Sequence, residues 1–388
     1  MWYFDSPEVV YGEDALSHLE TLRGKRAFIV TDPTILKLGF VDKVKEHLNE
    51  AGMQVAIFAE VEPDPSLQTV RRGAEIMRGF APDWIVGLGG GSSMDAAKAM
   101  WIMYERPELD PDEINPFVEL GLRQKARLVT IPTTSGTGAE ATWAIVLSDT
   151  EEQRKLGLGA RESLADVAIV DPALTANLPP QITADTGMDV LAHAVEGYTS
   201  AWHNDFCDGL CLKALQLVFE YLPRAYANGS KDPEAREKMH NAACIAGLGF
   251  GNSMAALAHA LGHALGGVFH VPHGRAVGLF VPYTIEFTVR GEESRYAEIA
   301  RFLGLPAGDE AEGAASLVQA IRDLARRIDQ PLTIRDLGIA QEDFVANLPS
   351  LVANAETDTQ MVTSSRVPST KQSEQLFRYA YEGKEIDF

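Results

Sequence analysis

The chain has 388 residues with a formal net charge of −21, and 46% of its residues are hydrophobic. This length and apolar content favour two domains with sizeable cores, and the excess of acid argues against nucleic acid or an anionic membrane as a partner. The three cysteines, Cys207, Cys211 and Cys244, form no disulfide framework and fit a reducing cytoplasm.

Short apolar strands alternate with helical patterns in the first half of the chain. Strands are predicted at 27–30, 54–58, 84–88 and 127–131, and helices at 41–51 and 69–78, the second helix ending before Gly79. This alternation is typical of parallel βαβ units. We therefore expect an α/β nucleotide-binding domain with a parallel sheet over residues 1–180.

The strand patterns stop at the proline pair 179–180, and helical sequence rich in Ala and Leu follows. An all-α domain is therefore expected over 181–388. Its most apolar stretch, 242–269, is interrupted by polar residues and glycines, which predicts buried helices and not a membrane span. The polar segment 357–370 is expected to run over the surface.

A run of glycines follows the strand predicted at 84–88. The strand enters the sequence GLGGGS at 87–92, and an Ala-rich helix containing Asp95 and Lys98 leaves it. Glycines allow the backbone to approach a phosphate closely, and the N–H groups at a helix start favour a pyrophosphate. The run is neither a strict dinucleotide fingerprint nor a P-loop, and a turn that merely tolerates glycine is the alternative.

Two further features could complete a nucleotide site. The loop 132–140, rich in hydroxyls and glycines, follows the next strand and could line a crevice at the sheet's switch point, although such loops are common. Asp32 ends the first predicted strand, where an acid can bind both ribose hydroxyls and favour NAD over NADP. The sequence Thr31-Asp32-Pro33 fits a helix N-cap equally well, so both interpretations of Asp32 stay open.

The second half contains a set of metal-binding side chains. Asp189 and His193 are four residues apart, as are His259 and His263, so each pair shares one face of a helix. His273 follows at a turn marked by proline and glycine. One carboxylate with two or three imidazoles suits a divalent transition metal with an open position, and hydrogen-bonded core residues are the alternative. The pair His259 and His263 lacks the glutamate of a zinc protease helix.

These segments together resemble the iron-containing alcohol dehydrogenase family over nearly the whole chain. The resemblance is carried by four segments: 89–98, 132–140, 187–198 and 258–274. It implies an α/β nucleotide-binding domain followed by an all-helical metal domain, an architecture shared with dehydroquinate synthase, with the active site in the cleft between them. Two departures are Ala165, where many relatives have proline, and the segment 360–370, which lacks the usual Asn-Pro-Arg ending.

The resemblance also implies roles for particular residues. The family's metal ligands fall on Asp189, His193, His259 and His273. Its additional catalytic histidine falls on His263. Cofactor contacts fall on Asp32 for the ribose, on Gly90, Gly91 and Ser92 for the pyrophosphate, and on Thr133, Thr134, Thr137, Lys155 and Leu174. Iron(II) is the metal that the family implies, and zinc or another divalent ion fits the same ligands.

We therefore expect a metal-dependent oxidoreductase that transfers a hydride between a primary or small alcohol and NAD, with NADP as the alternative cofactor. Two rivals share the architecture, a glycerol-phosphate dehydrogenase and a lyase like dehydroquinate synthase. Both act on phosphorylated substrates, yet the segments 189–203 and 259–273 contain no Lys or Arg. A non-catalytic metal protein would leave the glycine loop unexplained. A homo-oligomer, such as a dimer, is expected.

Overall fold

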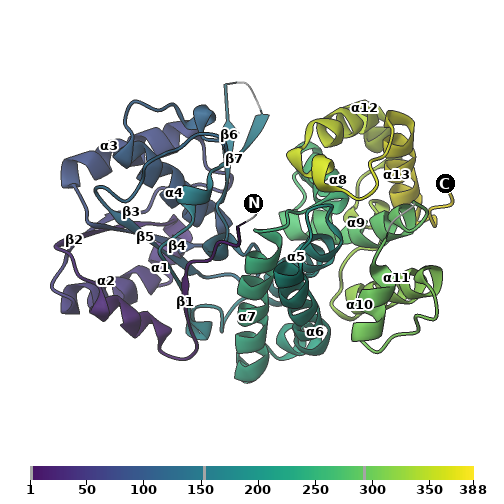
Figure 1. Cartoon of the computed structure of the whole chain (residues 1–388), viewed down its shortest axis with the longest axis horizontal. Coiled ribbons are helices and arrows are strands. Elements are labelled where there is room, and N and C mark those ends of the chain that lie inside the picture. The colour runs from purple at the N-terminus through teal and green to yellow at the C-terminus, as the bar shows by residue number, and fades with distance from the viewer. Residues whose placement is uncertain (1–2, 152–153, 292–293) are drawn as a thin grey trace. The chain divides into compact units, whose positions relative to one another are not determined.

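The computed structural model describes residues 3–151, 154–291 and 294–388. The chain divides into two compact units, Met1–Asn177 and Leu178–Phe388 (Figure 1). Among the described residues, the named strands all lie in the first unit, and the second unit is built from helices.

A six-stranded sheet forms the centre of the first unit. Its strands are β1 (Glu8–Tyr11), β2 (Arg26–Val30), β3 (Gln54–Phe58), β4 (Trp84–Gly89), β5 (Arg127–Pro132) and β8 (Val167–Val170). Every neighbouring pair is parallel, and the spatial order is β1-β8-β5-β4-β2-β3. The predicted parallel sheet is thus confirmed. The order reverses between β2 and β4, which makes that position the switch point where such sheets bind ligands.

Helices cover both faces of this sheet. They are α1 (Pro33–Lys37), α2 (Phe40–Glu50), α3 (Leu67–Phe80) and α4 (Gly91–Glu105). Because side chains alternate along a strand, Phe28 and Val30 pack with α3 and α4, whereas Ala27 and Ile29 pack with α2. Figure 1 shows α2 and α3 on opposite sides of the sheet. Both faces are therefore buried, as a parallel sheet requires.

Several details of the first unit differ from the sequence prediction, which did not include strands β1 and β8. Helix α3 continues through Gly79 and ends at Phe80, about two residues beyond the predicted end at 78, and its C-cap Ala81 has a φ of 53°. An antiparallel hairpin of β6 (Ala144–Asp149) and β7 (Arg154–Gly159) was not predicted. It contacts α4 through buried Lys98, whose Nζ donates to the carbonyl oxygen of Ala144 at 2.9 Å.

The second unit is a helical bundle around one apolar core. Its helices are α5 (Pro180–Thr199), α6 (Asp205–Asn228), α7 (Pro233–Phe250), α8 (Leu257–Phe269), α9 (His273–Thr288), α10 (Tyr296–Phe302), α11 (Glu310–Arg327), α12 (Gln341–Thr357) and α13 (Thr370–Glu382). Cys207 and Cys211 are buried on α6. No helix among the described residues is long and apolar enough to cross a membrane.

The expectation that 357–370 runs over the surface holds for only part of this segment. A 3₁₀ helix, η8 (Thr359–Thr363), follows α12, and Met361 and Thr363 are buried. The hydroxyl of Thr363 donates to the carbonyl oxygen of Ala255 at 2.5 Å, and its own carbonyl oxygen accepts from the N–H of Ala201 at 2.9 Å. Thr363 is thus used inside the unit, whereas other polar residues of this segment are exposed.

Candidate functional site

Three helices of the second unit bring the predicted metal ligands together. Asp189 and His193 lie on the buried face of α5, with 2% and 4% exposure. His259 lies in the first turn of α8, and His273 is the first residue of α9, after Pro272. The start of α9 can approach α5 because residue 274 is glycine, where a Cβ would lie 2.1 Å from the carbonyl oxygen of Asp185.

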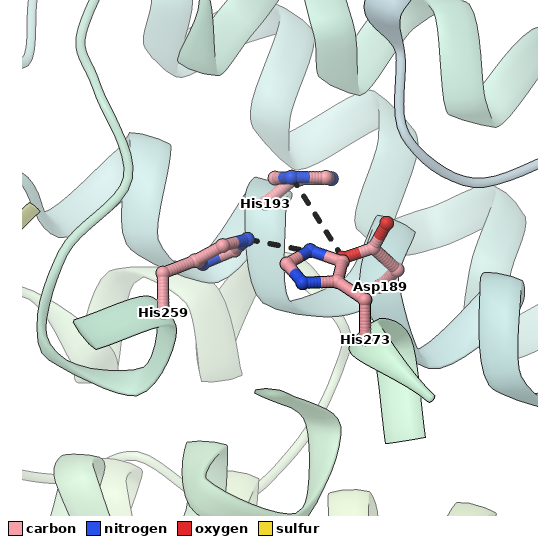
Figure 2. A group of neighbouring side chains, drawn as sticks. All are labelled: Asp189, His193, His259 and His273. Carbon is pink, nitrogen blue, oxygen red and sulfur yellow. Dashed lines mark ion pairs between the residues drawn. The ribbon is translucent and has the colours of Figure 1, made fainter. Parts of the chain in front are cut away.

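The four side chains point toward one position (Figure 2). The Nε2 atoms of His193 and His259 each lie 3.8 Å from Oδ1 of Asp189. Nε2 of His273 lies 3.2 Å from the same oxygen, and the ligand atoms of all four residues lie within 4.8 Å of one another. These separations are close to the roughly 3–4 Å between ligand atoms around one divalent ion.

The polar atoms of this cluster fit a metal. Oδ1 of Asp189 and Nε2 of His259 are buried and have no hydrogen-bond partner in the described structure, which is costly unless a ligand completes them. A carboxylate and three imidazoles match iron(II), zinc and similar ions. The side chain of His273 is 43% exposed, so solvent reaches the cluster at this residue. A catalytic metal site needs such an open position.

The protonation of these groups also suits a metal. Burial lowers the pKa of His193 to about 3, so its ring is neutral at neutral pH. Burial acts to raise the pKa of Asp189, but the neighbouring His193 and His273 outweigh it and hold that pKa well below its usual range. A neutral imidazole and an ionised carboxylate are the forms that bind metals.

The predicted catalytic residue His263 lies beside this cluster and outside the group of four converging residues. Its ring stacks on His273 at 5.2 Å between centroids. Nδ1 of His263 lies 2.7 Å from Oδ2 of Asp358, and 31% of the side chain is exposed. An ionised carboxylate can only accept, so Nδ1 carries the proton and Nε2 is left with a lone pair.

Three residues that contact the site histidines were not predicted from the sequence. Glu196 of α5 contacts Nδ1 of His259, and Asp358 contacts His263. The ring of Phe250 stacks on His193 at 3.9 Å with an interplanar angle of 6°. Glu196 offered one signal, because it is an acid on the same helical face as Asp189.

The glycine loop lies at the switch point of the sheet in the first unit. Gly90 is the N-cap of α4 and provides no side-chain cap, so the N–H groups of the first turn are available to an anion. Asp32 follows the neighbouring strand β2. Its Oδ1 caps α1 by accepting from the N–H groups of Thr34 and Ile35 at 2.8 and 3.1 Å. Its Oδ2 accepts from the hydroxyl of Ser93 at 3.1 Å. The capping interpretation is therefore observed, and the ribose contact stays a prediction.

The hydroxyl loop after β5 lies against the glycine loop. The N–H of Thr133 donates to the carbonyl oxygen of Gly89 at 2.9 Å. The side chain of Thr134 lies next to Gly90, where a Cβ would be 3.7 Å from its hydroxyl oxygen. The side chain of Thr137 lies next to Gly91, where a Cβ would be 3.1 Å from its methyl group. The loops after β4 and β5 therefore form one surface.

Two further residues that were predicted to contact the cofactor, Lys155 and Leu174, have other partners in the structure. Nζ of Lys155 is paired with Asp64 at 2.8 Å, and the N–H of Asp64 lies 3.4 Å from the hydroxyl oxygen of Ser92. Lys155 is thus connected to the glycine loop through one residue. Leu174 is 2% exposed and packs into the core with Ile29. The structure gives Leu174 a packing role, and its cofactor contact stays a prediction.

The model of the iron-containing alcohol dehydrogenase family matches residues 6–172, and the model of the C-terminal part of the Fe-containing alcohol dehydrogenase family matches residues 183–381. The two matches together cover most of both units. The chain belongs to the iron-containing alcohol dehydrogenase family.

Individual relatives agree with this assignment. The chain is 40% identical over 383 residues to the NADPH-dependent butanol dehydrogenase of Clostridium saccharobutylicum, covering 98% of each chain. It is 40% identical to the aldehyde-alcohol dehydrogenase of Streptococcus pneumoniae, covering 99% of this chain and 46% of that one, so it spans about half of that relative. The solved iron-containing alcohol dehydrogenase of Thermococcus thioreducens has a TM-score of 0.90 at 30% identity, covering 99% and 100% of the chains.

Proposed function

We propose that the chain is a metal-dependent dehydrogenase that transfers a hydride between a small primary alcohol and a nicotinamide cofactor, and that reduces the aldehyde in reverse. The observation that carries this proposal is the convergence of Asp189 with three histidines, where buried Oδ1 of Asp189 and Nε2 of His259 have no hydrogen-bond partner in the described structure. The cofactors are NAD(P) and a divalent metal, iron(II) for this family. We propose that residues 1–180 are the nucleotide-binding domain and residues 181–388 the metal-binding domain.

Each part of the chain has a proposed role in this reaction. A divalent metal supplies a Lewis acid that lowers the pKa of a hydroxyl and polarises a carbonyl. Its proposed ligands are Asp189, His193, His259 and His273. His263 accepts a proton at Nε2 and returns it, because Asp358 holds its Nδ1. Gly90, Gly91 and Ser92 bind the pyrophosphate at the start of α4, and Thr133, Thr134 and Thr137 complete that surface.

The two phosphate-dependent alternatives are not favoured. Arg275 is the basic residue nearest in sequence to the proposed ligands. Its Nε donates to Oδ1 of Asp185 at 2.9 Å and its Nη2 to Oδ2 at 3.2 Å, so its charge is already paired. Glycerol phosphate or another phosphorylated substrate would need a Lys or Arg near the ligands whose charge is not already paired with a carboxylate.

The activity is tested by following nicotinamide absorbance with a panel of primary alcohols and aldehydes on protein of known metal content. We expect turnover with short alcohols such as 1-propanol and 1-butanol, its loss after chelation and its return on adding iron(II) or zinc. Glycerol phosphate should give no turnover. Metal-loaded protein that is inactive with every alcohol and aldehyde would contradict the proposal.

Asp32 is proposed to bind the adenosine ribose, which would favour NAD, although one relative is NADPH-dependent. Asp32→Asn separates this role from capping, because asparagine caps helices as well as aspartate but carries no charge. We expect the ratio of kcat/KM for NADP to that for NAD to rise at least about tenfold, since repulsion of the 2′-phosphate is lost.

The control for this experiment is Asp309→Asn, which makes the same change at the N-cap of α11 in the other unit. It should leave the cofactor preference unaltered, and neither variant should lower the melting temperature appreciably. An unchanged preference in Asp32→Asn would assign Asp32 to capping alone.

Assembly and location are further proposals. We propose a homo-oligomer, a dimer being the simplest form, and a cytoplasmic location because the three cysteines are free thiols. Light scattering of the purified protein tests the first of these. A monomer at micromolar concentration would contradict it.

A further inference from the structure

Glu196 is a buried carboxylate on the face of α5 that carries two of the proposed ligands. It follows His193 by three residues and Asp189 by seven, and both spacings share one face of a helix. Only 4% of Glu196 is exposed. A carboxylate buried to this extent is costly unless donors satisfy it, so its partners define its role.

One oxygen of Glu196 caps the helix that carries His259. Oε1 accepts from the N–H of Ala258 at 2.5 Å and lies 3.4 Å from the backbone N of His259. These N–H groups lie in the first turn of α8, where the helix itself provides no acceptor. The N-cap residue, Ala256, makes no side-chain cap. Glu196 therefore supplies from α5 the acceptor that the start of α8 lacks.

The other oxygen of Glu196 fixes the ring of His259. Oε2 contacts Nδ1 of that ring. An ionised carboxylate only accepts, so Nδ1 carries a proton and, in the neutral ring, Nε2 keeps its lone pair. Nε2 is buried, has no hydrogen-bond partner in the described structure and lies 3.8 Å from Oδ1 of Asp189. The lone pair is thus directed at the proposed metal position.

We propose that Glu196 is a positioning residue of the metal centre, which sets the tautomer and direction of His259 and anchors the helix that carries it. The proposal rests on the proposed function, because it assumes that His259 binds a metal. His193 is supported differently, since its Nδ1 has no hydrogen-bond partner in the described structure and its ring stacks on Phe250. A carboxylate behind a ligating histidine raises its basicity and orients its ring.

The variant Glu196→Gln separates tautomer control from capping. If the glutamine oxygen keeps the cap on Ala258, its NH₂ group faces Nδ1 of His259 and moves the ring proton to Nε2, where the metal should bind. We expect Zn²⁺ affinity, measured by competition with a chromophoric chelator, to fall about 10- to 100-fold. A residue that only caps α8 would keep its acceptor in this variant, and Zn²⁺ affinity would not change.

The matched control is Glu310→Gln. Glu310 of α11 caps α10 in the same manner, accepting from the N–H groups of Tyr296 and Ala297 at 2.6 and 3.2 Å. Neither partner is a proposed ligand, so Zn²⁺ affinity should equal that of the native protein. Equal losses in both variants, or none in Glu196→Gln, would overturn the proposal. If the native protein binds neither Zn²⁺ nor Fe²⁺, the proposed function itself fails, and the inference falls with it.

A second measurement needs no variant. The ¹⁵N shifts of the two ring nitrogens in metal-free native protein report the tautomer of His259, with His259→Gln used to assign the signal. At a pH where the ring is neutral, we expect its single proton on Nδ1. A proton on Nε2 would overturn the proposal even if Glu196→Gln failed to fold.

Discussion

Replacing His259 with alanine is expected to remove the metal and to abolish alcohol oxidation. Only three of the four proposed ligands would remain, which is too few to hold the ion tightly. The lost Lewis acid contributes several kcal/mol to transition-state stabilisation, so turnover should fall on the order of 10³-fold or more. Elemental analysis of the purified variant, together with the nicotinamide assay, measures both effects.

The matched control for this variant is His240→Ala. His240 is 1% exposed on α7 and lies outside the converging group of four, so this variant removes an equally buried histidine that is not a proposed ligand. This variant should keep its metal. If it loses metal to the same extent as His259→Ala, general destabilisation of the helical unit and not loss of a ligand would explain the result.

His263→Ala should behave in the opposite way to His259→Ala. We expect near-stoichiometric metal and a turnover lower by about 10²–10⁴-fold, because the residue moves a proton and does not hold the ion. Added imidazole should restore part of the rate. If His263→Ala loses the metal and His259→Ala retains it, the proposed roles of the two histidines are reversed.

The parallel sheet could be predicted because β2, β4 and β5 are almost wholly buried and mostly apolar. The strand at 84–89 is buried along its whole length and ends in glycines, so neither its type nor its end was ambiguous. The hairpin of β6 and β7 was missed because its sequence lacks that signal. β6 alternates buried and exposed residues over a short span, and β7 contains two glycines.

The proposed ligands could be selected from the sequence because helical spacing places Asp189 beside His193 and His259 beside His263. The residues that support them could not. Glu196 precedes His259 by 63 residues, and Asp358 follows His263 by 95, so no local pattern links them. The segment 357–370 looked like surface because it is polar, yet Thr363 satisfies its hydroxyl against the backbone of Ala255.

The glycine loop leads to the second large effect that we expect. Gly89 has a φ of 147°, and a Cβ there would lie 2.5 Å from the hydroxyl oxygen of Ser93, so the fold itself requires glycine. Gly90 differs. Its φ and ψ are −77° and −172°, which valine readily adopts, and a Cβ would make only ordinary contacts of 3.7 and 3.8 Å with Thr134. The fold therefore tolerates a side chain at Gly90, and only a bound phosphate would exclude it.

Gly90→Val should consequently fold normally and keep its metal, while its affinity for NADH falls at least about tenfold, or roughly 1.4 kcal/mol. A fluorescence titration with NADH measures the loss. The control is Gly79→Val, since Gly79 is exposed on α3 and a Cβ there meets nothing within 4 Å. That variant should bind NADH as the native protein does. If Gly90→Val also binds NADH normally, the loop at 87–92 is a structural turn, and the pyrophosphate must bind to other backbone N–H groups.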